Sequence, residues 1–288
     1  MKVFDNREFD FSPRDFERIR QLIYDHAGIA LTDSKRELVY SRLSRRLRAT
    51  GIGTFADYLR LLESNNAAEW EAFTNSLTTN LTAFFREAHH FALLAEQLQA
   101  LGTARPISLW CSASSTGQEP YSMAMAAIDA FSSFTPPVTI IASDIDTQVL
   151  ETAKKGVYSL DQVEKLEPAL VRRFFLKGSN QQAGMVRVRP EVQRLVSFRQ
   201  VNLLEPRWPI QGGLDAIFCR NVMIYFDKDT QLKILKNMAP LLHPRGLLYA
   251  GHSENFYHAR GYFKLRGRTV YELDPAFLAQ AKHKPRTA

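Results

Sequence analysis

A turn of small residues near the middle of the chain has the composition of a ligand-binding loop. It reads Cys111-Ser-Ala-Ser-Ser-Thr-Gly, follows a short apolar segment and precedes a predicted helix whose first residue can be Pro120. Its single glycine, Gly117, does not complete the G-x-G-x-x-G pattern that brings a pyrophosphate to a helix N-terminus. Glu119, beside the predicted helix start, would repel a phosphate but could accept hydrogen bonds from a cationic amine. The turn therefore favours an amine-bearing ligand over a dinucleotide.

Polar residues also follow the next two predicted strands. Asp144 lies roughly 25 residues beyond the glycine turn, where an acid can bind ribose hydroxyls. It could instead cap the following helix, although Asp146 suits that role better. Asn202 and Leu203 could border an adenine ring, and a simple turn role for Asn202 is an equal alternative. A ligand with a ribose and an amino-acid group but no phosphate matches S-adenosylmethionine.

Alternating apolar and amphipathic segments position these residues from residue 107 onward. We expect strands at 107–110, 138–142, 195–201, 216–219 and 247–250, helices at 121–131, 147–155 and 231–242, and a closing hairpin at 263–273. This βαβ pattern implies an α/β fold with a doubly wound, mostly parallel sheet. Residues 157–195 interrupt the pattern with a polar helix and the alternating run Met185–Arg189, which predicts a small antiparallel β insert.

Residues 11–78 have the pattern of short helices, with Ser12 as a predicted cap and Gly28 as a predicted end of the first. A helix at 34–50 has an apolar stripe of Val39, Leu43 and Leu47. Its basic side chains at Lys35, Arg42, Arg45 and Arg46 fall within roughly a 100° arc. Six basic residues against one acid over this segment favour a docking face for an acidic partner. A solvated helix face is the alternative.

The bulk composition is that of a folded protein with a basic surface. The 288 residues allow two domains, 45% are hydrophobic, and the net charge is +7. We expect a cytoplasmic protein, because no apolar run reaches the ~18 residues of a membrane span. Cys111 and Cys219 are expected as free thiols, and the histidines lack a zinc-type spacing, so no metal site is predicted.

Five motifs, in order, resemble the CheR family of chemotaxis receptor glutamate methyltransferases over essentially the whole chain. They are Thr78–Glu87 (TTNLTAFFRE), Ser115–Ser122 (STGQEPYS), Ala142–Asp146 (ASDID), Phe218–Phe226 (FCRNVMIYF) and Gly251–Asn255 (GHSEN). The resemblance implies a helical domain at 1–78 and a class I methyltransferase domain at 79–288, with the β insert at about 157–195. It implies methyl transfer from S-adenosylmethionine to receptor glutamates, with S-adenosylhomocysteine as product.

The resemblance also implies roles for individual residues. The cofactor-binding set would be Asn80, Thr82, Arg86, Glu119, Asp144, Asn202, Leu203, Arg220 and Asn221. Gln118 departs from the acid expected there, without affecting a proposed contact. Arg86 and Tyr225 are the candidates for aligning the acceptor carboxylate, which is already ionised at neutral pH and needs no general base. A structural ion pair for Arg86 and a strand-end core position for Tyr225 are the alternatives.

The expected partner is the helical cytoplasmic region of methyl-accepting chemotaxis receptors, with their C-terminal peptide as a second candidate contact. We expect Met185–Arg189 to present a strand to such a peptide, with Arg187 meeting an acidic group and Val186 and Val188 packed inward. An edge strand protected by charge is the alternative. A nucleic-acid methyltransferase is disfavoured, because the basic helix carries only Tyr40 for base stacking. A non-catalytic adaptor that senses the cofactor is a third hypothesis.

Overall fold

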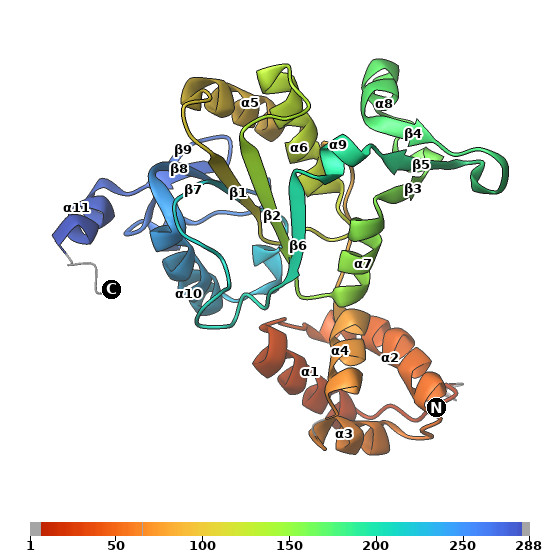
Figure 1. Ribbon diagram of the computed structural model, residues 1–288. Helices are drawn as coiled ribbons and strands as arrows, with labels where there is room; N and C mark the ends of the chain where they lie inside the picture. The colour runs from red at the N-terminus through yellow and green to blue at the C-terminus, as the bar shows by residue number, and fades with distance from the viewer. Residues whose placement is uncertain (1–6, 65, 284–288) are drawn as a thin grey trace. The chain divides into compact units, whose positions relative to one another are not determined.

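The computed structural model describes residues 7–64 and 66–283, which form two compact units. The first comprises Met1–Thr79 with Tyr225–Asp227, and the second comprises Asn80–Ile224 with Lys228–Ala288 (Figure 1). Among the described residues, no helix has both the length and the apolar character needed to cross a membrane.

The first unit is helical. Its elements are α1 (Pro13–Ala27), a 3₁₀ turn (Asp33–Lys35), α2 (Arg36–Thr50), α3 (Phe55–Glu63) and α4 (Ala67–Leu77). The predicted ends of α1 are confirmed: Ser12 and Asp15 form a reciprocal capping box, and Gly28 ends the helix with φ of 69°. The apolar stripe of α2, at Val39, Leu43 and Leu47, is completely buried. Burial of that stripe fixes which face of α2 remains outside.

The second unit contains a seven-stranded sheet in the order β6-β2-β1-β7-β8-β10-β9. The strands are β1 (Ile107–Cys111), β2 (Val138–Asp144), β6 (Val196–Gln200), β7 (Leu214–Cys219), β8 (Leu242–Ala250), β9 (Phe263–Gly267) and β10 (Val270–Leu273). The first five in spatial order are parallel, and β10 runs antiparallel to β8 and β9. This confirms the predicted mostly parallel sheet and the closing hairpin.

Helices cover both faces of this sheet. Figure 1 shows α5 (His89–Leu101) and α6 (Gln118–Phe131) on one face and α10 (Lys228–Met238) on the other, while α7 (Thr147–Lys155) follows β2. The last described element is α11 (Pro275–His283). The α10 helix stops earlier than predicted, and a 3₁₀ turn at Ala239–Leu241 leads into β8. Pro240 accounts for this, because it lacks the amide hydrogen that would continue the helix.

The predicted β insert is present as a separate three-stranded antiparallel sheet. Its strands are β3 (Val157–Ser159), β4 (Phe175–Lys177) and β5 (Met185–Val188), and short helices α8 (Pro168–Phe174) and α9 (Pro190–Gln193) accompany them. The order is β3-β5-β4, so the expectation that Met185–Arg189 offers an exposed edge is wrong. Both sides of β5 are already hydrogen-bonded, which leaves β3 and β4 as the edges.

The alternation within β5 has the predicted sense. Val186 and Val188 are buried, and Arg187 is exposed. In the register of the small sheet, Arg187 lies opposite Val157 of β3 and Leu176 of β4. On the exposed face of this sheet, the arginine therefore lies between two apolar residues. Arg189 follows the end of β5, is half-buried, and donates from its side chain to the Arg172 carbonyl at 3.4 Å.

Candidate active site

The parallel strands bring most of the predicted ligand-binding residues to one edge of the sheet. Strands β1, β2 and β7 end at Cys111, Asp144 and Cys219, and β6 ends shortly before Asn202. Because neighbouring parallel strands point the same way, the turns that follow them meet at the carboxyl edge, where doubly wound sheets bind ligands. Both cysteines are buried free thiols, as predicted.

The turn after β1 is held in a strained conformation. Ser115 has φ of 48°, and Gly117 has φ of 99° at the start of α6. A Cβ atom at Gly117 would lie 2.7 Å from the hydroxyl oxygen of Tyr158, which itself donates to the Thr116 carbonyl at 2.7 Å. Both the backbone angle and the lack of space therefore require glycine here. Non-glycine strain of the kind seen at Ser115 is characteristic of binding sites.

Asp144 is a buried carboxylate whose two oxygens both accept backbone hydrogen bonds. Ser115 N donates to Oδ2 at 2.8 Å and Asp146 N donates to Oδ1 at 3.1 Å. Burial raises the pKa of Asp144 to about 6, against the lowering effect of these bonds. Asp146 caps α7 by accepting from Gln148 N and Val149 N, as predicted. Asp144 is thus left with unused acceptor sites at the carboxyl edge.

Glu119 and Arg220 form a buried ion pair, a contact that the sequence did not suggest. Arg220 Nη1 lies 2.7 Å from Glu119 Oε2, and its Nη2 donates to the carbonyl of Arg86 at 2.5 Å. The thiol of Cys111 donates to the other Glu119 oxygen at 3.3 Å. Burial raises the pKa of Glu119, and Arg220 only partly offsets this. Both residues belong to the predicted cofactor set, and the structure brings them together.

Two further acids at this edge were not predicted as site residues. Glu254 accepts from the backbone N–H groups of Asn221, Val222, Met223 and Gly251, at 2.5 to 3.0 Å. Glu87 lies 3.2 Å from Arg220 Nη2 and 3.4 Å from the side-chain nitrogen of Asn221. Both acids are within the motifs Gly251–Asn255 and Thr78–Glu87. Their positions in these motifs could have marked them as site residues, whereas the sequence does not show that they are buried.

The acids outnumber the bases at this edge. Glu119, Asp144 and Glu254 are buried and Glu87 is half-buried, whereas the described residues of this edge include one buried guanidinium, that of Arg220, which pairs with Glu87 and Glu119. Burial raises the pKa of Glu254, whereas a backbone hydrogen bond from His252 and the charge of Arg220 outweigh burial and lower the pKa of Glu87. Such an excess of buried carboxylates suits a ligand that carries positive charge, as the sulfonium and ammonium groups of S-adenosylmethionine do.

The segment from Asn80 to Glu87 is anchored to the same edge. Asn80 Nδ2 donates to Asp146 Oδ2 at 2.9 Å, and Ser115 Oγ donates to the carbonyl of Asn80 at 3.0 Å. Phe85 and Glu87, on either side of Arg86, have φ of 52° and 57°. The half-buried Arg86 donates to the Leu81 carbonyl at 2.9 Å and forms no ion pair within the described residues. Strained backbone on both sides thus fixes the position of this arginine.

The remaining predicted residues have simpler environments. Thr82 is half-buried, and Leu203 is buried. Asn202 accepts from Leu204 N at 3.0 Å through its side chain, which is the turn role considered as an alternative. Asn221 has φ of 57°, in the loop that Glu254 holds. Tyr225 is not a strand-end residue: it ends a 3₁₀ turn and belongs to the helical unit, where its carbonyl accepts from Ala30 N at 2.9 Å.

The basic side chains of α2 and its entrance divide into two classes. Arg42 donates to the Thr78 carbonyl at 2.6 Å, and Arg46 pairs at 2.8 Å with the buried carboxylate of Glu69. Lys35 and Arg45 are exposed and form no ion pair within residues 7–64 and 66–283. The four cations therefore do not form one uniform docking face, because two of them hold their own unit together.

Comparisons with known proteins agree with this geometry. The family described as "CheR methyltransferase, SAM binding domain" matches residues 80–271, and "CheR methyltransferase, all-alpha domain" matches residues 14–78. The chain is 53% identical to chemotaxis protein methyltransferase 2 of Pseudomonas aeruginosa, covering 93% of this chain and 96% of that one. It is 54% identical to the chemotaxis protein methyltransferase of Salmonella typhimurium and 52% identical to that of Escherichia coli, covering 91% of each chain in both pairs. The chain therefore belongs to the CheR family of S-adenosylmethionine-dependent chemotaxis protein methyltransferases.

Proposed function

We propose that this protein methylates glutamate side chains of chemotaxis receptors and that the carboxyl edge of its sheet is the reaction site. The excess of buried carboxylates over the single Arg220 is the observation that carries the assignment of the site. It provides an anionic environment for a cationic methyl donor. Family membership supports the reaction class and the acceptor.

The cofactor contacts follow from the chemistry of each side chain. Asp144 would bind the ribose hydroxyls, since its oxygens keep acceptor sites beyond these backbone bonds. Glu119 would accept from the ammonium group, with Arg220 limiting the cost of keeping that carboxylate ionised. Asn202 and Leu203 would border the adenine. The other members of the proposed set, around the methionine portion and the sulfonium, are Asn80, Thr82, Arg86 and Asn221.

When bound, S-adenosylmethionine supplies an electrophilic methyl group with a good leaving group. The protein's task is then to desolvate the acceptor carboxylate and align one of its oxygens, which is catalysis by proximity and orientation. Arg86 is suited to this, because its backbone is fixed on both sides and its guanidinium keeps donors beyond the one given to Leu81. Tyr225 is the second candidate for aligning the carboxylate, through its hydroxyl.

A labelling experiment tests the reaction. Methyl-labelled S-adenosylmethionine is incubated with the protein and receptor-bearing membranes, and the expected product is a base-labile methyl ester on the receptor. The Asp144→Asn variant serves as the matched control, and it should lose most of the labelling. Label in nucleic acid, or label on protein that survives base, would contradict the proposed acceptor.

The receptor's helical region is the proposed partner of the α2 face in the cytoplasm, through Lys35 and Arg45. Exposed cations steer and orient an acidic surface without contributing to the fold. The double variant Lys35→Glu/Arg45→Glu should raise the KM for receptor and leave cofactor affinity unchanged. Arg14→Glu, an exposed reversal elsewhere in the same unit, is the control. Equal receptor KM values for the double variant and the control would exclude this docking face.

The β insert is the proposed contact for the receptor's C-terminal peptide. An added strand would pair with β3 or β4, whose outer edges are open, while the exposed Arg187 meets an acidic group from the face of the sheet. Tethering raises local concentration and leaves the chemistry alone. Arg187→Ala should thus reduce methylation at low receptor density only when the receptor has its last residues. Arg194→Ala, an exposed arginine of the same insert, is the matched control, and full activity of Arg187→Ala on the intact receptor would remove the tether role.

A further inference from the structure

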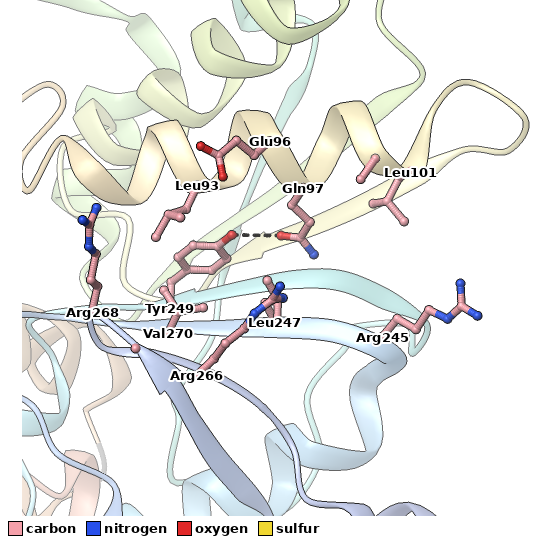
Figure 2. Close-up of a pocket in the computed structure, with 12 residues that line it drawn as sticks. Leu93, Glu96, Gln97, Leu101, Arg245, Leu247, Tyr249, Arg266, Arg268 and Val270 are labelled. Carbon is pink, nitrogen blue, oxygen red and sulfur yellow. Dashed lines mark hydrogen bonds between the residues drawn. The ribbon is translucent and has the colours of Figure 1, made fainter.

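A second concave site lies in the methyltransferase unit, apart from every residue of the proposed cofactor set. It is a pocket of about 530 Å³ between α5 and the strands β8, β10 and β9 (Figure 2). This volume is within the range of small-molecule sites. The established reaction does not use it.

The floor of the pocket is aliphatic. Leu247 and Val270 come from the neighbouring strands β8 and β10, and Leu93 comes from α5. The one aromatic ring of the floor, Tyr249, is completely buried, and its hydroxyl donates to Gln97 Oε1 at 2.9 Å (Figure 2). Leu247, Val270 and Tyr249 are buried, so the apolar contact surface comes from the half-buried Leu93 and Leu101 and the exposed Ala100 of the lining. The described lining has no exposed ring on which a nucleobase could stack.

The rim of the pocket is basic. Arg245, Arg266 and Arg268 are exposed, and none of their side chains forms an ion pair or a hydrogen bond with another described residue. Glu96 is the single acid of the lining. Figure 2 shows Arg268 and Arg245 toward opposite ends of the pocket in that view, with Arg266 between them.

Arg266 lines the pocket, and so does Glu96. Burial raises the pKa of the Tyr249 hydroxyl, Arg266 opposes that rise, and Glu96 adds to it. Protection of an edge strand is the ordinary role for exposed cations on a sheet, and it would account for Arg266 on β9. Arg245 lies between Leu242 and Leu247, where the pairing of β8 with β7 shifts register and the assigned pairing with β10 does not reach.

We propose that this pocket binds a small amphipathic organic anion. The aliphatic body of the ligand covers the floor, and its carboxylate or phosphate group pairs with Arg266, which lies between the other two rim arginines in Figure 2. A guanidinium matches either anion in a bidentate manner. A ligand with both an anionic group and an aliphatic body would complement unpaired arginines beside an apolar surface. The proposal is independent of the methyl acceptor.

Calorimetry with four probes of simple chemistry tests this site. Octyl phosphate and octanoate carry both properties, octyl glucoside carries the aliphatic body without the charge, and inorganic phosphate carries the charge without the body. We expect binding of one or both anionic amphiphiles below their micelle concentrations, and at least about tenfold weaker binding of the other two probes. Which anion binds more tightly distinguishes a carboxylate site from a phosphate site. Failure of both anionic amphiphiles to bind would overturn the proposal.

Variants locate the bound probe. Arg266→Gln/Arg268→Gln should weaken binding of the anionic amphiphile at least about tenfold, whereas Arg194→Gln, an exposed arginine outside the pocket, should leave it unchanged. Binding of S-adenosylhomocysteine verifies that each variant is folded. Displacement of the amphiphile by S-adenosylhomocysteine, or parental affinity of the double variant, would place the probe elsewhere and refute the site.

Discussion

Asp144 gives the proposed cofactor site a pH dependence that can be worked out from the structure. Its carboxylate is buried, burial raises its pKa to about 6, and only the ionised form can accept both ribose hydroxyls. At pH 5 about a tenth of the protein would have Asp144 ionised. Since apparent affinity scales with the competent fraction, S-adenosylhomocysteine should bind about tenfold more weakly at pH 5 than at pH 7.

Titration of Asp144 does not weaken binding at pH 5 by unfolding the protein. Protonation of Asp144 increases the free energy of unfolding, whereas it decreases the affinity for the ligand. A carboxyl whose folded pKa lies above its unfolded value of 3.8 stabilises the fold below pH 3.8. That contribution, about 3 kcal/mol for a shift of this size, is lost as pH rises through about 6. At pH 5 Asp144 therefore favours the folded protein while it disfavours the bound ligand.

Calorimetric titration of S-adenosylhomocysteine from pH 5 to 8 is the assay, with circular dichroism at each pH as the control for folding. The product is preferred over the methyl donor because it has no sulfonium charge, so the ribose contact is better isolated. Asp144→Asn should bind at least about tenfold more weakly at pH 7 and lose the step near pH 6. A parent profile that is flat from pH 5 to 8, or parental affinity of the variant, would refute the ribose role of Asp144.

Three further substitutions test how the site and the helical unit are held. Glu254→Gln should lower the methyl-transfer rate about tenfold or more and also lower the melting temperature, because an amide cannot accept all four backbone N–H groups, three of which position the Asn221 loop; an unchanged kcat contradicts this. Arg46→Ala should cost about 2 to 3 kcal/mol in urea unfolding by leaving a buried glutamate unpaired, against about 0.5 kcal/mol or less for Arg45→Ala. Equal effects of the two would argue against a structural role for Arg46. Gly117→Ala should destabilise the second unit and weaken S-adenosylhomocysteine binding, since its Cβ would meet a tyrosine hydroxyl at 2.7 Å; normal binding by calorimetry would show that the turn relaxes.

Local patterns in the sequence determined the kinds of elements and their order. Apolar residues repeat every second position in a half-buried strand and every three to four positions in a half-buried helix. Each segment therefore indicates its own type of element through the spacing of its apolar residues. The caps at Ser12 and Asp146 could likewise be predicted, because a cap involves only residues a few positions apart. The carboxyl edge could be located because parallel strands must present their ends together. Motif resemblance added the reaction class.

Contacts between distant residues were decided only by the tertiary structure. The ion pair of Glu119 with Arg220 and the three hydrogen bonds that Glu254 accepts from Asn221, Val222 and Met223 join segments far apart in the chain, so no local pattern could indicate them. The sequence also could not show which cations of α2 are already paired, since the partner of Arg46, Glu69, lies on another helix. The position of β5 inside its sheet was also undetermined, because alternation indicates two faces of a strand but not how many neighbours pair with it. Sequence thus determined which groups are present at the site, and the three-dimensional packing determined which of them are already paired and which remain available to a ligand.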